Sequence, residues 1–232
     1  MSTSSEHIHQ APLLGIYGGT FDPIHNAHIL PVQAAANLLG IDQIRLLPCH
    51  IPPHKSSPNV SNQHRLKMVQ QVCDHEPRFC LDTRELQRDK PSYTFDTMRA
   101  FRAEFPHHSI CFFIGMDSLL NFHKWHRWKE LLTLCHLVVA ARPGYSWQVP
   151  PALASTFATA QSTDITDFKR ELYGRIYLAH TLELDISSTM IREKLRKGES
   201  VDGFLPQYTL SYIRSHHLYL RKPADATSAN GV

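Results

Sequence analysis

The chain has 232 residues, 42% of them hydrophobic, and a formal net charge of +3, so it can bury a sizeable core and is unlike a protein that coats nucleic acid. Its five cysteines, an odd number without a Cys-x-x-Cys pair, argue against a disulfide framework or a zinc ribbon and fit a reducing compartment. No apolar run is long enough to span a membrane, so we expect a cytoplasmic protein without a membrane partner.

Short apolar runs alternate with helical patterns along the chain. Strands are predicted at residues 13–17, 43–48, 79–83, 109–114, 135–141 and 175–179. Helices are predicted at 26–39, 61–74, 94–105, 127–133, 189–197 and 206–215, while 143–170 reads as a connection containing a helix of uncertain limits. This alternation predicts an α/β fold: a Rossmann-like parallel sheet with flanking helices and a small helical C-terminal part. We expect one domain over residues 12–222 and disordered tails at 1–11 and 223–232.

The first predicted strand runs into a glycine turn and a helix start. Gly18 and Gly19 let the backbone approach an anion closely, and Thr20 adds a hydroxyl. His25 and His28, three residues apart where the helix begins, would face the same side and can donate hydrogen bonds to phosphate oxygens. A plain strand–turn–helix with chance histidines is one alternative. A zinc pair is another, but no HExxH glutamate accompanies the histidines, so we predict a phosphate site and no metal ligands.

Two charged residues follow predicted strands at their carboxyl ends, where open α/β sheets bind ligands. Asp117 comes after the apolar strand at 109–114, although an aspartate there can also cap a helix. Arg142 comes after the strand at 135–141 and can hold a phosphate or lie on the surface.

The helix predicted at 189–197 has its own anion-binding features. Ser187 or Ser188 can cap it, and Gly198 can end it. Hydroxyls and amides at such a helix start can also hold phosphates, and Arg192 offers a planar donor fork. Capping and phosphate binding are compatible with each other.

Two further features are ambiguous from the residues alone. Trp125 and Trp128 lie in a polar stretch, where ligand stacking and core packing both account for a tryptophan. Lys55 lies in a proline-containing loop and is by default a solvated charge, although it can reach a bound nucleotide if the loop moves.

Two of these segments together resemble the signature of the nucleotidylyltransferase superfamily. Residues 18–28 read GGTFDPIHNAH against the usual GGTFDPxHxGH, with Ala27 in place of a glycine, and residues 186–192 read ISSTMIR against ISSTxIR. Other segments are similar to one branch, bacterial nicotinate-nucleotide adenylyltransferase: PPHK at 52–55, PSYT at 91–94, GMDSL at 115–119, Trp125, and RPGY at 142–145. The branch often has tyrosine after this tryptophan, where the chain has His126.

The resemblance implies transfer of the adenylyl group of ATP to nicotinate mononucleotide in NAD biosynthesis, with Mg²⁺ carried by ATP. It implies that the catalytic residues are His25, His28 and Arg192. The residues that it implies for ATP are Gly18, Gly19, Thr20, Phe21, His25, His28, Asp117, Ser188, Thr189 and Arg192. Those that it implies for nicotinate mononucleotide are Lys55, Tyr93, Thr94, Asp117, Trp125 and Arg142.

Several alternatives stay open. A sister adenylyltransferase would use nicotinamide mononucleotide or phosphopantetheine as the acceptor. A nucleotide-binding regulator would bind ATP without turnover. A nucleic-acid-binding module is disfavoured by the weak net charge and by the lack of a basic run with interleaved aromatic residues. The sequence does not distinguish a monomer from a homo-oligomer.

Overall fold

The computed structural model describes residues 10–49, 58–88, 92–140, 149–182 and 184–220. Within these residues, six strands form one sheet: β1 (Leu13–Gly19), β2 (Ile44–Pro48), β3 (Phe79–Leu81), β4 (Ser109–Gly115), β5 (His136–Ala140) and β6 (Ile176–Ala179). All neighbouring pairs are parallel, in the order β3-β2-β1-β4-β5-β6. The six predicted strands are therefore confirmed, and so is the parallel sheet.

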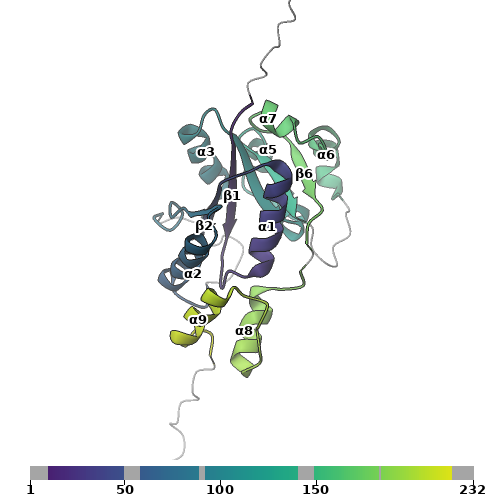
Figure 1. Ribbon diagram of the computed structural model, residues 1–232. Coiled ribbons are helices and arrows are strands. Elements are labelled where there is room, and N and C mark those ends of the chain that lie inside the picture. Colours follow the sequence, from purple (N-terminus) through teal and green to yellow (C-terminus); the bar gives the residue numbers. More distant parts are fainter. Residues whose placement is uncertain (1–9, 50–57, 89–91, 141–148, 183, 221–232) are drawn as a thin grey trace, which may run out of the picture.

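Helices lie between successive strands and pack against the sheet, and further helices follow the last strand (Figure 1). They are α1 (Asn26–Leu39), α2 (Asn62–His75), α3 (Thr94–Glu104), α4 (Met116–Leu120), α5 (Trp128–Leu131), α6 (Ala154–Ala160), α7 (Asp167–Arg170), α8 (Ser188–Lys197) and α9 (Gln207–Ser215), with 3₁₀ turns η1 (Phe122–Lys124) and η2 (Pro151–Leu153). The six predicted helices are all present. The sequence did not predict α4 or η1, and the uncertain connection contains η2, α6 and α7. Elements of three to seven residues are too short to give a periodic pattern.

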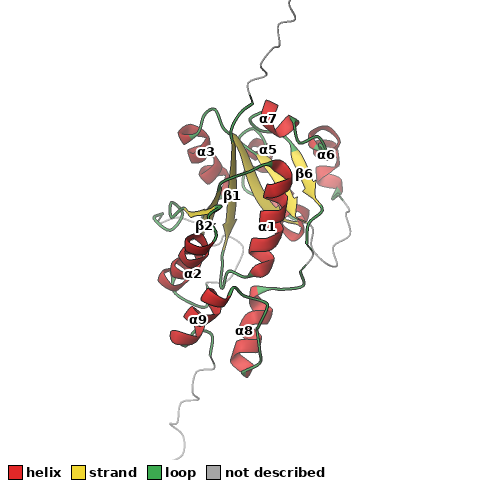
Figure 2. Ribbon diagram, viewed as in Figure 1, coloured by secondary structure: helices red, strands yellow, loops and turns green. Residues whose placement is uncertain are grey.

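Each face of the sheet has its own hydrophobic core, because successive strand side chains point to opposite faces. In β4, Cys111 and Phe113 join the core formed with α1, α2, α8 and α9. Phe112 and Ile114 join the core formed with α3, α4, α5 and α6. Figure 2 shows the resulting layers, with helices on both sides of the strands. Among the described residues, no helix is both long and apolar enough to cross a bilayer.

The strand order reverses between β1 and β4, which lie side by side at the centre of the sheet. Chains of this topology bind ligands in the crevice beyond the carboxyl ends of these strands. Figure 1 shows α8 and α9 at this same end of the sheet. The C-terminal helices therefore lie close to the edge where the fold predicts a site.

A buried histidine at the start of β5 makes the stability of the fold depend on pH. Nδ1 of His136 accepts from Arg175 N at 3.0 Å, which places the ring proton on Nε2, 2.9 Å from Glu171 O. Burial lowers the pKa of His136 from 6.5 to about 4. The unfolded chain therefore takes up a proton between these values while the folded chain does not, so stability is lost as the pH falls below 6.5.

We expect this residue to make the protein about 2 kcal/mol less stable at pH 5 than at pH 7. Urea unfolding at both pH values measures the difference, and His136→Gln serves as the comparison because glutamine offers a donor and an acceptor but does not titrate. The variant should lose less stability on acidification than the parent protein. An equal loss in both proteins would contradict the assignment.

Candidate functional site

A cavity of about 560 Å³ lies at the carboxyl ends of the central strands. Gly18 and Gly19 of β1, Gly115 of β4 and Ala140 of β5 line its floor. Eleven of the residues predicted for the site line the cavity: Gly18, Gly19, Thr20, Phe21, His25, His28, Asp117, Trp125, Ser188, Thr189 and Arg192. The parallel topology thus brings both sequence motifs, about 160 residues apart in the chain, to the same cavity.

The turn between β1 and α1, residues 20–25, is called the glycine turn because Gly18 and Gly19 precede it. It is built around one aromatic ring. Phe21 has a left-handed backbone with φ of 48°, which is uncommon for a side chain of this size, and its ring is 1% exposed. A Cβ atom on Gly19 would lie 2.7 Å from this ring, so only glycine fits beneath Phe21. Ala27, the departure from the family pattern, lines the cavity in the first turn of α1.

The two histidines at the start of α1 stack on each other, as their spacing predicts. His25 is the N-cap residue and is 1% exposed, and its ring centroid lies 3.6 Å from that of His28. The His28 ring also lies in a T-shaped arrangement with Phe21, at 5.3 Å between centroids, and in a tilted one with Tyr17, at 6.2 Å. These three neighbours fix the orientation of the ring.

One backbone hydrogen bond determines the tautomer of neutral His28. The His25 N–H donates to Nδ1 of His28 at 3.2 Å, so the ring proton lies on Nε2. His28 lines the cavity, and in this tautomer its Nε2 is an N–H donor rather than a lone pair, which suits an anionic oxygen.

The start of α8 forms the opposite wall of the cavity. Ser187 caps the helix by accepting from Met190 N at 3.2 Å, and Gly198 ends it with φ of 71°, as predicted. Ser188 Oγ donates to Pro23 O at 3.0 Å and so joins this helix to the glycine turn. Arg192 lies one turn further on, where Nη1 donates to Asp22 O at 2.7 Å and Nη2 to Thr189 Oγ1 at 3.1 Å.

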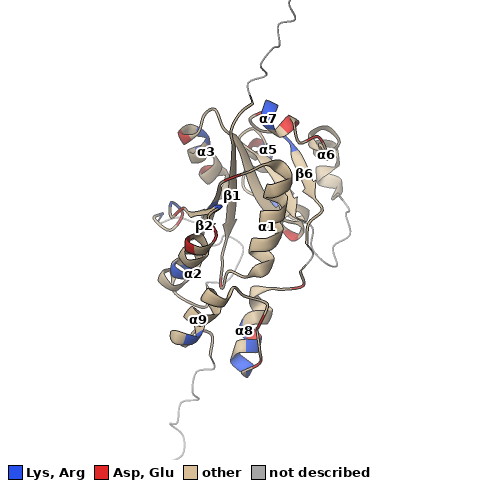
Figure 3. Cartoon of the chain, in the orientation of Figure 1, with Lys and Arg blue, Asp and Glu red and all other residues tan. Residues whose placement is uncertain are grey.

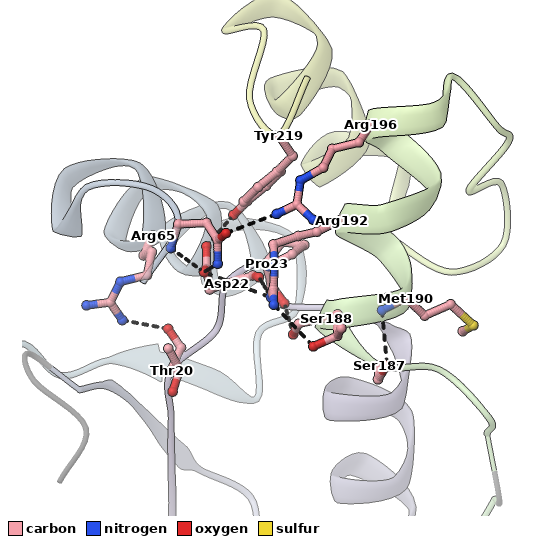
Figure 4. Close-up of polar contacts among 12 residues, drawn as sticks. Thr20, Asp22, Pro23, Arg65, Ser187, Ser188, Met190, Arg192, Arg196 and Tyr219 are labelled. Carbon is pink, nitrogen blue, oxygen red and sulfur yellow. Dashed lines mark hydrogen bonds and ion pairs between the residues drawn. The ribbon is translucent and has the colours of Figure 1, made fainter. Parts of the chain in front are cut away.

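The Asp22 carboxylate connects four parts of the chain, a role that sequence reasoning missed. Oδ2 accepts from Asn59 N at 2.7 Å and from Asn59 Nδ2 at 3.1 Å, and Oδ1 accepts from Tyr219 Oη at 2.8 Å. Arg192 Nη1 lies 3.9 Å from Oδ2. Figure 4 shows Arg192 from α8 and Tyr219 from the C-terminal segment converging on Asp22.

A buried arginine supports the turn from behind. Arg65 in α2 is fully buried and donates to Thr20 O and Cys49 O, both at 2.5 Å, and to Asn62 Oδ1 at 2.6 Å. Thr20 and Cys49 directly follow β1 and β2, so Arg65 ties together the carboxyl ends of two neighbouring strands.

Basic residues continue along α8 beyond the cavity (Figure 3). Lys194, Arg196 and Lys197 lie in its last turn. Arg196 Nη2 donates to Asn59 Oδ1 at 3.1 Å, and Asn59 itself lines the cavity. The wall formed by α8 is therefore positively charged.

Two predicted residues lie at the far side of the cavity, against β4. Asp117 is in the first turn of α4, but Gly115 is the N-cap residue, so the expectation that Asp117 could be the cap is wrong. A Cβ atom on Gly115 would lie 2.6 Å from Asp117 Oδ1, so glycine makes room for this carboxylate. The Trp125 ring packs against Phe122 at 5.4 Å between centroids and also lines the cavity, so packing and exposure to a ligand coexist.

Of the other residues predicted for the acceptor, the structure describes two. Tyr93 and Thr94, at the start of α3, do not line the cavity. The Tyr93 ring lies 4.7 Å from the His126 ring, measured between centroids. His126 directly follows Trp125, which lines the cavity. Lys55 and Arg142 lie outside the described residues. Within the described part, no three His, Cys, Asp or Glu side chains group as they would to hold a metal ion.

Comparison with known proteins finds a matching family model and relatives that share one name. A family model described as "Cytidylyltransferase-like" matches residues 16–194. A protein named "Probable nicotinate-nucleotide adenylyltransferase" from Aeromonas salmonicida is 47% identical over 210 residues, which is 90% of this chain and 98% of the relative. A protein of the same name from Yersinia pestis is 46% identical over 218 residues, 93% of this chain and 97% of the relative.

Solved structures resemble the fold. Nicotinic acid mononucleotide adenylyltransferase of Plasmodium falciparum, complexed with APC, has a TM-score of 0.69 and 20% identity, with 90% of this chain and 97% of that chain covered. The complex of the same protein with NaAD has a TM-score of 0.66 and 20% identity, covering 89% and 97%. At this identity the likeness supports the fold.

Proposed function

The chain belongs to the nicotinate-nucleotide adenylyltransferase family, and from this premise we propose that it transfers the adenylyl group of ATP to nicotinate mononucleotide. The products are nicotinate adenine dinucleotide and pyrophosphate. One observation carries the proposal: His28 and the start of α8, with Arg192, line a single cavity at the point where the strand order reverses. That is where this topology binds nucleotides.

In the proposed reaction, a phosphate oxygen of the mononucleotide attacks the α-phosphorus of ATP in line. A new phosphorus–oxygen bond forms, the bond between the α-phosphorus and the bridging oxygen to the β-phosphorus breaks, and pyrophosphate leaves with that oxygen. The attacking group is already an anion, so the chain need not supply a nucleophile or a strong base. Its task is to position the two substrates and to stabilise the charge that develops on the phosphates.

The donors around the cavity match this task. The Nε2–H of His28 is held in place by its ring neighbours and suits the α-phosphate. Ser188, Thr189 and Arg192 at the start of α8 suit the β- and γ-phosphates, because hydroxyls, a helix N-terminus and a guanidinium all favour anions. The nucleotide would lie along the turn, in contact with Gly18, Gly19, Thr20 and Phe21. His25 would stack behind His28, and Asp117 would bind a ribose hydroxyl.

Mg²⁺ belongs to this proposal as an ion carried by ATP. The donors that face the cavity are mainly hydroxyls, imidazoles and a guanidinium, a set that suits an anion better than a cation. The ion would partly neutralise the triphosphate, and it would be held by phosphate oxygens and water.

The acceptor half of the site rests on fewer contacts. Trp125 is proposed to stack on the pyridine ring, since its side chain lines the cavity beyond Asp117. Tyr93 and Thr94 are proposed to read the nicotinate carboxylate, which requires the start of α3 to contribute from beside His126. Lys55 and Arg142 stay proposed contacts from the family resemblance alone.

The test is to incubate the protein with ATP and Mg²⁺ and, separately, with nicotinate mononucleotide, nicotinamide mononucleotide and phosphopantetheine. Chromatography then quantifies the adenylylated product and pyrophosphate. We expect strong preference for the nicotinate form. Product with another acceptor alone would keep the phosphate site and discard the roles of Trp125 and Thr94. ATP binding without any product would favour a regulator.

A further inference from the structure

The C-terminal segment reaches back to the glycine turn through a single side chain. Tyr219 lies four residues beyond the end of α9, is 8% exposed, and donates its hydroxyl proton to Asp22 Oδ1 at 2.8 Å. Burial, together with the Asp22 carboxylate, raises the pKa of Tyr219. The hydroxyl therefore keeps its proton at neutral pH and acts as the donor of this bond.

The backbone after α9 is shaped to bring this tyrosine inward. His217 and Tyr219 have φ of 50° and 61°, a left-handed backbone conformation that residues other than glycine rarely adopt. The His217 and Leu218 amides close the end of the helix on Arg214 O at 3.2 Å and Ile213 O at 3.0 Å. Two uncommon backbone conformations within three residues indicate that the surrounding contacts fix this segment in place.

Asp22 transmits the contact to groups that line the cavity. Its carboxylate lies 3.9 Å from Arg192 Nη1, and the same nitrogen donates to the Asp22 carbonyl at 2.7 Å. Through Oδ2, the carboxylate oxygen nearest Arg192, it also orients Asn59, which lines the cavity and accepts from Arg196. Tyr219 is not among the residues that line the cavity, so its hydroxyl would act on a ligand there indirectly, through Asp22.

We propose that Tyr219 is a positioning residue for the phosphates of ATP, because its hydroxyl fixes the Asp22 carboxylate that holds Arg192 and Asn59 toward the cavity. The proposal rests on the proposed function, since it takes Arg192 to bind the triphosphate. It makes a side chain 197 residues from Asp22 in the chain part of the ATP site. It also predicts that a substitution of Tyr219 affects ATP and not nicotinate mononucleotide, because the acceptor side, near Trp125, lies away from these contacts.

The test is steady-state kinetics of the full chain carrying Tyr219→Phe, which removes the hydroxyl and keeps the ring. We expect kcat/KM for ATP to fall about tenfold, the loss of one hydrogen bond to a charged group, while KM for nicotinate mononucleotide stays unchanged. Tyr212→Phe is the matched control. Tyr212 lies on α9, and its hydroxyl lies 3.0 Å from His64 Nδ1, away from the glycine turn. This variant should keep the parental values for ATP.

Additional measurements separate positioning from folding. All variants are assayed at a temperature at which circular dichroism shows them folded, and Tyr219→Phe is combined with Arg192→Ala. The tyrosine substitution should have a smaller effect in that background than in the parent protein, because part of its influence passes through Arg192. Asp22→Asn, which keeps an oxygen for Tyr219 but removes the charge, should give the same ATP-selective loss.

The outcomes are distinguishable. An active parent protein, together with a Tyr219→Phe variant that behaves like Tyr212→Phe, would overturn the positioning role and leave the proposed function intact. Equal losses for both substrates, or full additivity with Arg192→Ala, would also overturn it by indicating a general structural effect. A parent protein without adenylyl transfer would instead remove the proposed function on which the role rests.

Discussion

Replacing His28 with alanine should lower kcat by about 10²–10³-fold and change KM for ATP far less. The reason is that the proposed hydrogen bond from Nε2–H to the α-phosphate is strongest in the transition state. Negative charge on the α-phosphate oxygens grows as the acceptor attacks, so a donor fixed there stabilises the transition state more than bound ATP. The cap bond from His25 N and the contact with Phe21 hold the donor in place beforehand.

Steady-state kinetics with saturating nicotinate mononucleotide separates the two effects, with His107→Ala as the control. His107 is exposed and precedes β4, so it lies at the amino end of the strands, opposite the cavity. His28→Asn is the second variant, because its amide oxygen can still accept from His25 N and keep the helix cap. We expect this variant to retain stability without regaining kcat. Equal changes in kcat and in ATP binding would make His28 a ground-state anchor instead.

The elements that position His28 were predictable because their signals are local. β1, β4 and β5 are short apolar runs between turn residues, and α1 lies between its N-cap residue His25 and its C-cap residue Gly40. Once a parallel sheet is inferred, the carboxyl ends of its strands must lie together. The position of the site therefore followed from the sequence without any contact being known.

The contacts that rigidify the site were not predictable in this way. Asp22 reads as a turn residue beside a proline, and its partner Tyr219 is 197 residues away. Nothing local marks two residues so distant as neighbours. The start of α3 shows the opposite limit: Thr94 begins its helix as predicted, yet it does not line the cavity, because a motif fixes the local structure but not the direction it faces.

Arg65 is the clearest case of a residue whose role the sequence hides. It lies in a polar helix with a lysine two positions away, and a charged side chain in such a pattern is ordinarily solvated. Here it is fully buried, and the oxygens that accept from it belong to the backbone of Thr20 and Cys49 and to the side-chain amide of Asn62. Backbone acceptors leave no trace in a residue pattern.

Arg65→Met should therefore destabilise the protein by about 3 kcal/mol, measured as the change in the free energy of unfolding in urea. Methionine fills much of the space but donates no hydrogen bond, so carbonyl oxygens after β1 and β2 lose their partner where water does not replace it. Lys67→Met, an exposed position on the same helix, is the matched control and should change stability by less than about 0.5 kcal/mol.

Arg65→Lys distinguishes charge from geometry. A lysine keeps the positive charge but cannot reach the two strand ends with a planar fork, so it should recover only part of the lost stability. The opposite result is also physically meaningful, because burying a guanidinium against neutral oxygens is costly and a well-packed apolar side chain sometimes replaces a buried ion without loss. A methionine variant as stable as the parent would mean that the desolvation of Arg65 outweighs its bonds. The arginine would then be retained for the shape of the glycine turn, and the loss would appear in KM for ATP instead.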